Sequence, residues 1–459
     1  MIQISDSDPY PLTWASLHVN SVPSFLENDS RVMMRHSNGD LHCAVVSAQG
    51  AKSKISVIVN SGSEGPWRTL VDEFPSENTS TSDDLPATDS NGNGIYVAFI
   101  RSAADGLCYG YVAHIPPSIE GVISDTHIHG PLTAGSKQLI SSFIQVSGEY
   151  NSVCYGWVDI SAGNVYAGIS RDGIRFSRAV SVAQEAVGAL ARSAVGIYGD
   201  YAACAYLVKS DIGWTTKFVE TADAGGTWSN PTELSELSSS PAIRSRYLVS
   251  DDQDIKREIL QVPFAAETAG SIQLLAWPAP ASTTEEFQLK SRLFVLSTVS
   301  SVPASSRDIS LVSFKPIGPS GTFDNVTPDG VDITVRGIDL PFDRQVWSKY
   351  AALPQTPVRA IASLHEGDLQ STAQRPRRLV LHVSTNTGQS FDRERTFELD
   401  PEHSLGNAVS NSACLFVDDT DSVWLDLVAS IDGASDGELV HVMVPCGLQV
   451  TGLDPSKAW

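Results

Sequence analysis

The sequence contains no long apolar run, few cysteines, and far fewer basic than acidic residues. None of its apolar stretches approaches the roughly 18 residues that a membrane-spanning helix requires. The 53 Asp and Glu residues outnumber the 31 Lys and Arg residues, which gives a formal net charge of −22. A surface of this charge repels nucleic acid and anionic membranes, because binding to either normally depends on clustered Lys and Arg side chains. The composition therefore argues against both as partners.

The N-terminal stretch MIQISDSDPYPLTW has no basic segment followed by an apolar one, so it lacks the pattern of a secretory signal peptide. A cytoplasmic protein is predicted, with a mature secreted chain that carries a start Met as the alternative. None of the six cysteines forms a Cys-x-x-Cys pair, and each lies in an apolar stretch that resembles a strand. We interpret them as small buried hydrophobic residues, because a disulfide framework would suit a smaller secreted chain.

Helical periodicity is scarce, and runs that alternate between apolar and polar residues dominate. Four segments of the first half align on a small residue followed by a large one, at a spacing of roughly fifty-odd residues. They are DLHCAVVS around Ala44, GIYVAFIRS around Ala98, SVCYGWVDIS around Gly156 and YAACAYLVKS around Ala205. A turn and a second strand pattern follow each segment. A unit of this size with about four short antiparallel strands is typical of a β-propeller blade, because one small twisted sheet can bury its faces only against neighbouring sheets.

We therefore predict an all-β fold: a β-propeller of four-stranded antiparallel blades that forms a single domain over residues 1–459. Seven blades fit the pattern best, with six or eight as alternatives. The region of about 241–340 is irregular and is predicted to hold one blade with an insertion, or two blades. The N-terminal strand PLTWASLHV is predicted to complete the last blade and close the ring. The stretch SENTSTSDDLPATDSNGN is predicted to be a surface loop.

The turn TADAGGTW, Thr221–Trp228, resembles the Asp-box, S-x-D-x-G-x-T-W, of sialidases and related propellers. Asp223 can accept backbone N–H bonds in a tight turn, Gly225 allows a positive φ, and Trp228 can pack the turn onto the blade. Partial copies recur after the third strand of other units. They are Ser170, Asp172, Gly173 and Phe176; Ser384, Asn386, Gly388 and Phe391; and Ser61, Gly65 and Trp67.

This resemblance implies a sialidase-like Asp-box (BNR repeat) propeller. In that superfamily the box joins the third and fourth strands of a blade, on the rim opposite the ligand face. Asp223 is therefore predicted to be structural and not catalytic. Hydrolases, lectins and scaffolds all carry the box, so the resemblance indicates a fold far more specifically than a function.

The stretch SDTHIHGPL supplies candidate chemistry. Its Asp-x-His-x-His pattern, Asp125, His127 and His129, resembles the metal motif of amidohydrolases over about six residues. Those enzymes place the motif on an α/β barrel and need further downstream histidines, so we reject that family. On an extended chain His127 and His129 point the same way and could share a divalent metal or a substrate. The stretch is predicted to cross from the second to the third blade on the ligand face, with a plain exposed loop as the alternative. A further metal ligand is predicted to come from His36 or His365.

A sialidase also grips a carboxylate with three arginines and uses a tyrosine nucleophile that a glutamate activates. By residue type and position, Arg35, Arg246, Tyr350 and Glu233 are the candidates for these roles. The chain departs from the family where it has Arg-Val-Met in place of the Arg-Ile-Pro signature. That departure puts true sialidase activity in doubt.

The functional hypothesis is a sialidase-like propeller enzyme that acts on a glycan or a polar small molecule in a central axial pocket, with glycoside hydrolysis as the leading reaction. One alternative is a non-hydrolytic lyase, isomerase or cyclase on the same scaffold. Another is a lectin-like or scaffold binding module without catalysis. Core residues repeat from unit to unit but no loop signature does, which favours one axial site over several peripheral ones. No cofactor is predicted beyond the divalent metal, and the sequence leaves the oligomeric state open.

Overall fold

The computed structural model describes the chain in segments. These are residues 3–7, 10–17, 32–35, 40–49, 52–60, 67–76, 81–117, 126–146, 151–198, 200–210, 213–238, 247–250, 256–266, 271–278, 293–298, 309–314, 332–335, 344–353, 356–366, 377–385, 392–399, 405–431 and 439–453.

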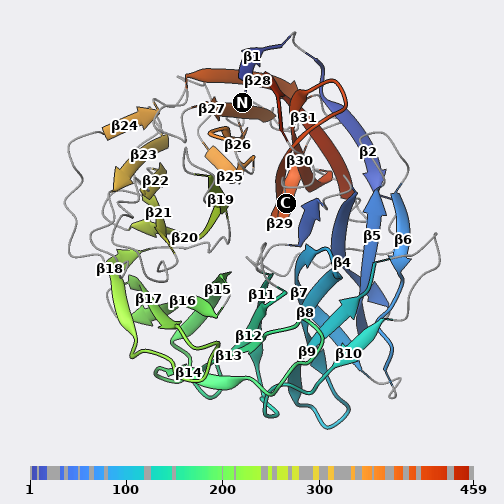
Figure 1. Ribbon diagram of the computed structural model, residues 1–459, viewed down its shortest axis with the longest axis vertical. Helices are drawn as coiled ribbons and strands as arrows, with labels where there is room; N and C mark the ends of the chain where they lie inside the picture. Colours follow the sequence, from blue (N-terminus) through green and yellow to red (C-terminus); the bar gives the residue numbers. More distant parts are fainter. Residues whose placement is uncertain are drawn as a thin grey trace, which may run out of the picture.

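The described residues form β-strands without any helix, and these strands make seven antiparallel sheets. Figure 1 shows the sheets arranged around a common centre in chain order, as in a β-propeller. The first strand of a sheet lies nearest the centre and later strands lie toward the periphery. The prediction of an all-β fold built from four-stranded antiparallel sheets is thereby confirmed. Within the described segments, no helix has the length and apolar character needed to cross a bilayer.

The first four sheets have four strands each. Sheet 1 contains β3 (Met33–Arg35), β4 (Leu41–Gln49), β5 (Lys52–Asn60) and β6 (Trp67–Val71). Sheet 2 contains β7 (Ser82–Asn91), β8 (Gly94–Ser102), β9 (Cys108–Ile115) and β10 (His127–His129). Sheet 3 contains β11 (Leu139–Val146), β12 (Val153–Asp159), β13 (Asn164–Ser170) and β14 (Val180–Gln184). Sheet 4 contains β15 (Leu190–Tyr198), β16 (Tyr201–Ser210), β17 (Gly213–Thr221) and β18 (Thr232–Ser238).

The remaining sheets differ in size. The region that the sequence marks as irregular forms one six-stranded sheet, sheet 5, with β19 (Tyr247–Ser250), β20 (Lys256–Ala266), β21 (Ser271–Pro278), β22 (Leu293–Thr298), β23 (Ile309–Phe314) and β24 (Asp332–Val335). Sheet 6 contains β25 (Arg344–Ala352), β26 (Arg359–Glu366), β27 (Arg377–Ser384) and β28 (Arg393–Leu399). Sheet 7 joins β29 (Leu405–Val417), β30 (Ser422–Ile431) and β31 (Leu439–Thr451) to the N-terminal strands β1 (Gln3–Asp6) and β2 (Thr13–Leu17), which both pair with β31.

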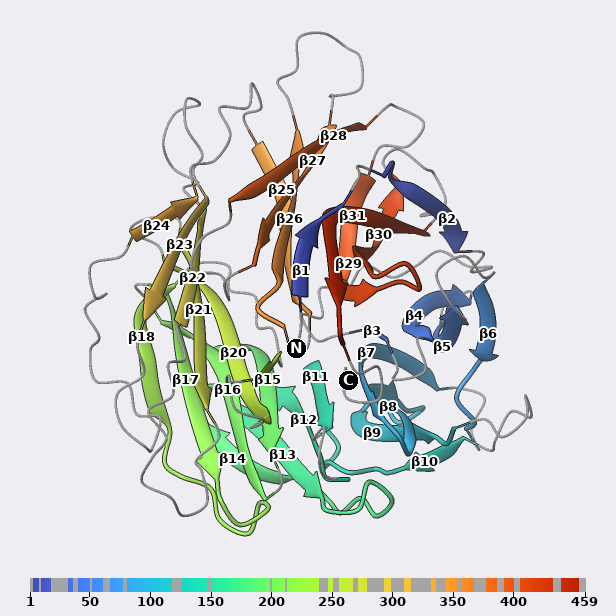
Figure 2. The same ribbon diagram turned by 45° about the horizontal axis from the view of Figure 1, so that its top comes forward.

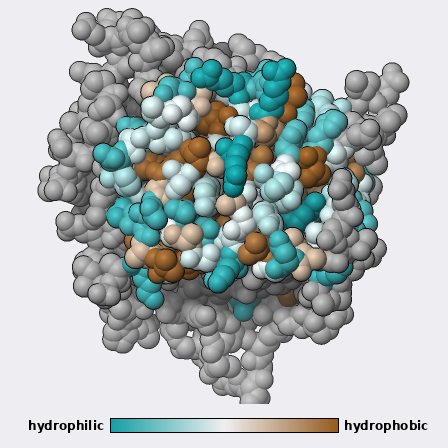
Figure 3. Space-filling model, turned by 90° about the horizontal axis from the view of Figure 1, so that it is seen from below, coloured by the Kyte–Doolittle hydropathy of each residue, from teal (hydrophilic) through white to brown (hydrophobic). Residues whose placement is uncertain are grey.

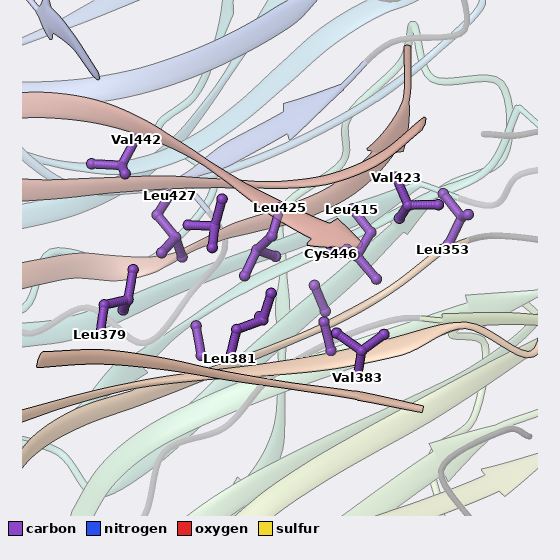
Figure 4. Close-up of a cluster of buried hydrophobic side chains, with 14 of the residues drawn as sticks. Leu353, Leu379, Leu381, Val383, Leu415, Val423, Leu425, Leu427, Val442 and Cys446 are labelled. Carbon is purple, nitrogen blue, oxygen red and sulfur yellow. The ribbon is translucent and has the colours of Figure 1, made fainter. Parts of the chain in front are cut away.

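The core consists of apolar layers between neighbouring sheets. One buried cluster joins sheets 1 and 2, one joins sheets 2 and 3, and one joins sheets 3 and 4. Figure 2 shows neighbouring sheets facing one another around the centre. Figure 4 shows the layer between sheets 6 and 7, where Leu379 and Leu381 of β27 approach Leu425 and Leu427 of β30. Full burial of a Leu or Val side chain contributes about 1.5–3 kcal/mol, so these layers are the main source of stability.

The small residues of the sequence repeat lie in the second strands of sheets 1–4. Gly156 shows why a small residue is needed there, because a Cβ atom at this position would lie 2.3 Å from the ring of Phe143 on β11. It would also lie 2.0 Å from the carbonyl oxygen of Tyr166 on β13. The close approach of three strands therefore excludes a side chain.

The prediction of a surface loop over SENTSTSDDLPATDSNGN was wrong for its second half. Residues Ser82–Asn91 form β7, the strand of sheet 2 nearest the centre, and most of them are buried. Their polar side chains have buried partners. Asp89, for example, accepts a hydrogen bond of 2.7 Å from the backbone N–H of Val146 on the next sheet.

Large apolar side chains are exposed around the outermost strand of sheet 3. They are Ile174, Val180 and Val187. Figure 3 views the molecule from the side on which β13 and β14 lie in Figure 1, and there the hydrophobic groups alternate with hydrophilic ones. This pattern is common on protein surfaces, where apolar side chains are often exposed singly.

Candidate functional site

Each sheet has two distinct ends, because its strands run antiparallel. At one end, the start end, the first strand begins beside the turn between the second and third strands. At the other, the box end, the turn between the first two strands lies beside the turn between the last two. In sheet 4 the backbone N–H of Ala224 donates to the carbonyl of Asp200, which joins the two turns of the box end at 2.8 Å. A ligand face opposite the Asp-box therefore corresponds to the start end.

The start end of sheet 2 contains a buried ion pair. Arg101 donates from Nε to Asp83 Oδ1 at 2.7 Å and from Nη2 to Oδ2 at 2.6 Å, so the pair is bidentate. The same guanidinium donates to the carbonyls of Pro75 and Phe74 at 3.1 and 3.4 Å. Burial raises the pKa of Asp83, while Arg101 acts in the opposite direction. The pair thus ties β7 and β8 to the crossing between sheets 1 and 2.

Asp84, the next residue on β7, is half-buried and has a different environment. Burial raises the pKa of its carboxyl above the usual range of Asp, and the neighbouring charge of Asp83 adds to this effect. A hydrogen bond with Ser53 of sheet 1 acts in the opposite direction. The hydroxyl of Ser53 also lies 2.6 Å from that of Ser82. Asp84 is therefore a carboxyl that holds its proton to a higher pH than an exposed Asp and that is hydrogen-bonded to Ser53.

The backbone after Asp84 leaves the regular strand geometry. Asp84 pairs with Ile100, and pairing resumes only at Ala87 with Ala98, so Leu85 and Pro86 form a bulge. Leu85 has a φ of 52°, in the left-handed region that costs a residue with a Cβ of order 1–3 kcal/mol. Bulges of this kind terminate or re-aim a strand and often occur next to active sites.

Register shifts occur near the start of the first strand in other sheets as well. They lie at Leu139/Ser141 in sheet 3, Leu190/Ser193 in sheet 4, Gln345/Trp347 in sheet 6 and Leu405/Ala408 in sheet 7. The bend is therefore a property of the repeated unit. What distinguishes sheet 2 is that two acidic residues, Asp83 and Asp84, immediately precede the bend.

The predicted register of the histidine stretch was wrong. His127–His129 is not the crossing after the outermost strand of sheet 2 but is that strand itself, β10, which pairs with β9. Figure 1 places β10 at the periphery of the molecule. His127 pairs with His114, whose Nε2 donates to the carbonyl of Asn93 in the turn between β7 and β8 at 2.9 Å. The two predicted histidines therefore lie at the box end, away from the centre and from the start end.

Aromatic rings surround the histidines at this end. His114 stacks on Tyr96 with ring centroids 4.6 Å apart, and His129 lies 4.6 Å from Phe176. Burial lowers the pKa values of His114 and His129 below the usual value of 6.5, and the nearby imidazoles lower them further. Among the described residues no group of three His, Cys, Asp or Glu side chains could hold a metal ion. What the structure shows here is a packed aromatic cluster.

The Thr221–Trp228 turn connects β17 to β18, the third and fourth strands of sheet 4. Asp223 Oδ1 accepts from the backbone N–H of Thr227 at 2.9 Å and from the hydroxyl of Thr221 at 2.7 Å, and Oδ2 accepts from the hydroxyl of Thr227 at 2.8 Å. These bonds lower the pKa of Asp223 to about 2. Gly225 has a φ of 81°, as the turn requires. Every one of these contacts is internal to the turn, which agrees with a structural role.

The partial copy at Ser170–Phe176 occupies the same place between β13 and β14 of sheet 3. Asp172 Oδ1 accepts from the backbone N–H groups of Ile174 and Arg175 at 2.9 and 2.8 Å, and these bonds lower its pKa. Phe176 contacts Tyr155, at 5.2 Å between ring centroids. Ser384 ends β27, the third strand of sheet 6, and is buried, whereas Asn386 lies outside the described residues.

Arg35, a predicted substrate-binding arginine, lies in a buried cluster between sheets 1 and 7. Its Nη2 donates to Asp426 Oδ2 at 2.7 Å, and its Cζ lies 3.7 Å from the centroid of the Phe416 ring. His441 Nε2 donates to the other oxygen of Asp426 at 2.8 Å. Burial alone would raise the pKa of Asp426, but the charge of Arg35 and the hydrogen bonds from His441 and Arg35 hold it below its usual range. The guanidinium thus joins two sheets.

The roles of the other predicted site residues stay predictions. Asp125, Arg246 and His36 lie outside the described residues. Tyr350 on β25 and Glu233 on β18 are described in backbone only, and they belong to different sheets. Glu233 pairs with Lys217, whose Nζ binds Glu185 at 2.9 Å.

Sequence reasoning missed Asp83, Asp84 and Arg101. A weak signal was present, because Arg101 ends the apolar run GIYVAFIRS and a charge at that point of a buried strand needs a partner. The acidic pair stood in a stretch whose Ser, Thr and Asn residues indicated a loop. Only the pairing of β7 with β8 places the acids opposite the arginine.

No family model matches the sequence, and no curated protein matches it. Among solved structures, the chain is similar to the polysaccharide lyase Uly1, with 9% identity and a TM-score of 0.43, covering 92% of this chain and 90% of that one. It is similar to the Trypanosoma rangeli sialidase in complex with the inhibitor DANA, with 14% identity, a TM-score of 0.37, and coverage of 94% and 59%. It is also similar to the six-bladed fucose-recognising lectin of Aleuria aurantia, with 12% identity, a TM-score of 0.36, and coverage of 68% and 98%. A function for the chain therefore has to come from the geometry of its own residues.

Proposed function

We propose that the chain is a seven-bladed β-propeller in one domain, with a ring closed by the pairing of β1 and β2 with β31, and that it is an enzyme acting on a glycan. Seven sheets among the described residues and the two N-terminal strand pairings support the architecture. The Asp-box resemblance puts the ligand face at the start end of the sheets. Asp84 is a half-buried carboxyl at that end.

The position of Asp84, half-buried at the start of β7 directly before the Leu85 bulge, is the observation that carries the enzymatic proposal, and the raised pKa of its carboxyl agrees with it. A carboxyl with a raised pKa holds its proton to a higher pH than an exposed Asp and is suited to act as a general acid, and glycosidases raise the pKa of their acid by burial in this way. In a hydrolase it protonates the oxygen of the leaving group. The hydroxyls of Ser53 and Ser82, which lie 2.6 Å apart, are suited to hydrogen bonds with sugar hydroxyls. Asp83 is bound by Arg101, so Asp84 is the member of the acidic pair assigned to proton transfer.

The test is a panel of neutral and acidic polysaccharides assayed with the unmodified protein and the Asp84→Asn variant. We expect turnover of at least one polysaccharide, lowered by about 10²- to 10⁴-fold in the variant, which is the usual contribution of a general acid or base. Saturated new reducing ends identify a hydrolase, and unsaturated products identify a lyase. Asp72→Asn is the matched control, because Asp72 precedes the same crossing and its side chain is 76% exposed.

Undiminished turnover in the Asp84→Asn variant would remove Asp84 from the chemistry. Glycan binding that depends on Asp84, without turnover of any polysaccharide, would instead identify a binding module.

A further inference from the structure

The bulge that follows Asp84 is held from the neighbouring sheet. Ser142 on β11 of sheet 3 is fully buried, and its hydroxyl donates to the carbonyl oxygen of Leu85. On the strand opposite, the carbonyl of Phe99 accepts a hydrogen bond of 3.0 Å from Nε1 of Trp157, which also belongs to sheet 3. Both sides of the bulge are therefore bound by side chains of the next sheet.

These contacts satisfy carbonyl groups at a point where the β7–β8 ladder is interrupted. Pairing passes from Asp84 with Ile100 to Ala87 with Ala98, so Leu85 lies in the interrupted part. The Ser142 hydroxyl also lies 3.3 Å from the carbonyl of Ala98, where the ladder resumes. A buried carbonyl without a partner is unfavourable, and Leu85 additionally has a φ of 52°. The Ser142 hydroxyl, a donor from outside the sheet, therefore helps to stabilise this backbone conformation.

Asp84 stands between two fixed points. Before it, Asp83 is bound by Arg101, which the carbonyls of Pro75 and Phe74 hold in turn. After it, Leu85 is bound by Ser142. The direction of the Asp84 side chain and the depth at which it lies follow from these two attachments, one to the crossing from sheet 1 and one to sheet 3.

We propose that Ser142 is a positioning residue for the acid–base group: it holds the Leu85 bulge, and the bulge keeps the Asp84 carboxyl half-buried beside Ser53. This inference rests on the proposed function for its catalytic meaning. The effect of Ser142 on the pKa of Asp84 can be measured without a substrate.

The experiment is a carboxyl-carbon NMR titration of Asp84 in the unmodified protein, in Ser142→Ala and in Ser142→Thr, with Asp84→Asn used to assign the signal. Removal of the hydroxyl releases the bulge and admits water, so we expect the pKa of Asp84 in Ser142→Ala to fall toward the ordinary value of Asp. Ser142→Thr keeps a hydroxyl at the same position, and in it we expect the pKa to stay raised. Trp157→Phe removes the donor to Phe99 together with part of a fully buried ring. It should lower the pKa in the same direction and is the second variant if Ser142→Ala does not fold.

Activity provides the second readout once a substrate has been found. We expect kcat of Ser142→Ala to fall by about tenfold or more with little change in KM, since misplacement of a catalytic group by about 1 Å can cost 10²-fold. The limb of the pH profile that reports Asp84 should move to lower pH. An unchanged pKa of Asp84 in folded Ser142→Ala and Trp157→Phe would overturn the positioning role. A lowered pKa combined with full activity of Asp84→Asn would leave the positioning intact and overturn the proposed function.

Discussion

The two ends of sheet 2 both bury ionisable side chains, but they do so with opposite chemistry. At the start end the groups are the carboxyls of Asp83 and Asp84, and burial raises their pKa values. At the box end they are the imidazoles of His114 and His129, and burial lowers theirs. The cause is the same at both ends, because burial favours the neutral form. The neutral carboxyl has kept its titratable proton and the neutral imidazole has released its own, so the two ends respond to pH in opposite directions.

The neighbours of the ionisable groups also differ between the two ends. At the start end the half-buried carboxyl of Asp84 is hydrogen-bonded to Ser53, next to a backbone bulge. At the box end the histidines pack against the rings of Tyr96 and Phe176. A titratable cluster is thus insufficient to indicate a site, and the neighbours of each group decide its role.

The largest effect is expected from Arg101→Met. This variant leaves Asp83 buried without its bidentate partner, and removal of one member of a buried ion pair typically costs about 3–5 kcal/mol. Chemical denaturation should show this loss in the free energy of unfolding at neutral pH. Lys54→Met is the matched control at the same end, because Lys54 pairs with the exposed Asp72 at 3.0 Å and such pairs contribute about 0–1 kcal/mol. Equal effects of the two variants would show that the start end does not bury its charges.

The thermal stability of the protein should depend on pH through His129 at the box end. Since the folded-state pKa of His129 lies below the unfolded value of 6.5, its stabilising effect is complete above about 6.5 and is lost as the pH falls through the lowered folded-state pKa. The His129→Phe variant cannot take up that proton and can keep the contact with Phe176. We expect its melting temperature to fall less than that of the unmodified protein between about pH 7 and pH 5. Parallel curves for the two proteins would contradict a depressed pKa.

The smallest effect is expected from the turn of sheet 4. Asp223→Ala removes all three bonds that the carboxylate accepts within the turn, whereas Asp223→Asn keeps one acceptor oxygen. We expect the melting temperature to fall in both variants, and more in Asp223→Ala. Because the turn lowers the pKa of Asp223 from 3.8 to about 2, the loss of each variant relative to the unmodified protein should be complete at any pH above about 4 and shrink as the pH falls toward 2. Activity per folded molecule should stay unchanged, and its loss in a stable variant would show a role in function.

Local chemistry explains which features could be predicted from the sequence. The succession of strands could be predicted from the alternation of apolar and polar residues. The small residue of each repeat marked the second strand, where Gly156 packs closely between β11 and β13. The turn at Asp223 could be interpreted because the hydrogen bonds of the Asp223 carboxylate join residues within eight consecutive positions.

What could not be predicted depends on partners that are distant in the sequence. Asp84 stands in a stretch whose composition indicates a loop, and its environment comes from Ser53, from Arg101 through Asp83, and from the bulge that Ser142 binds. The strand β10 has only three residues, His127–His129, and its polar sequence carries no strand pattern. Its place at the edge of sheet 2 follows from pairing with β9 and from the aromatic rings around it.

The cluster of Arg35, Asp426 and His441 has a consequence for the order of folding. Arg35 and Asp426 are separated by 391 positions, so their contact can form only after nearly the whole chain has been synthesised. Neighbouring sheets such as 2 and 3 can pack much earlier, since their contacts span far shorter distances along the chain. The entropic cost of closing a loop grows only with the logarithm of its length. The long separation of Arg35 and Asp426 therefore makes their contact form late but adds little to its entropic cost. Until it forms, one face of sheet 1 lacks its partner, which makes the interval before that contact the time at which the nascent chain is most exposed to association with other molecules.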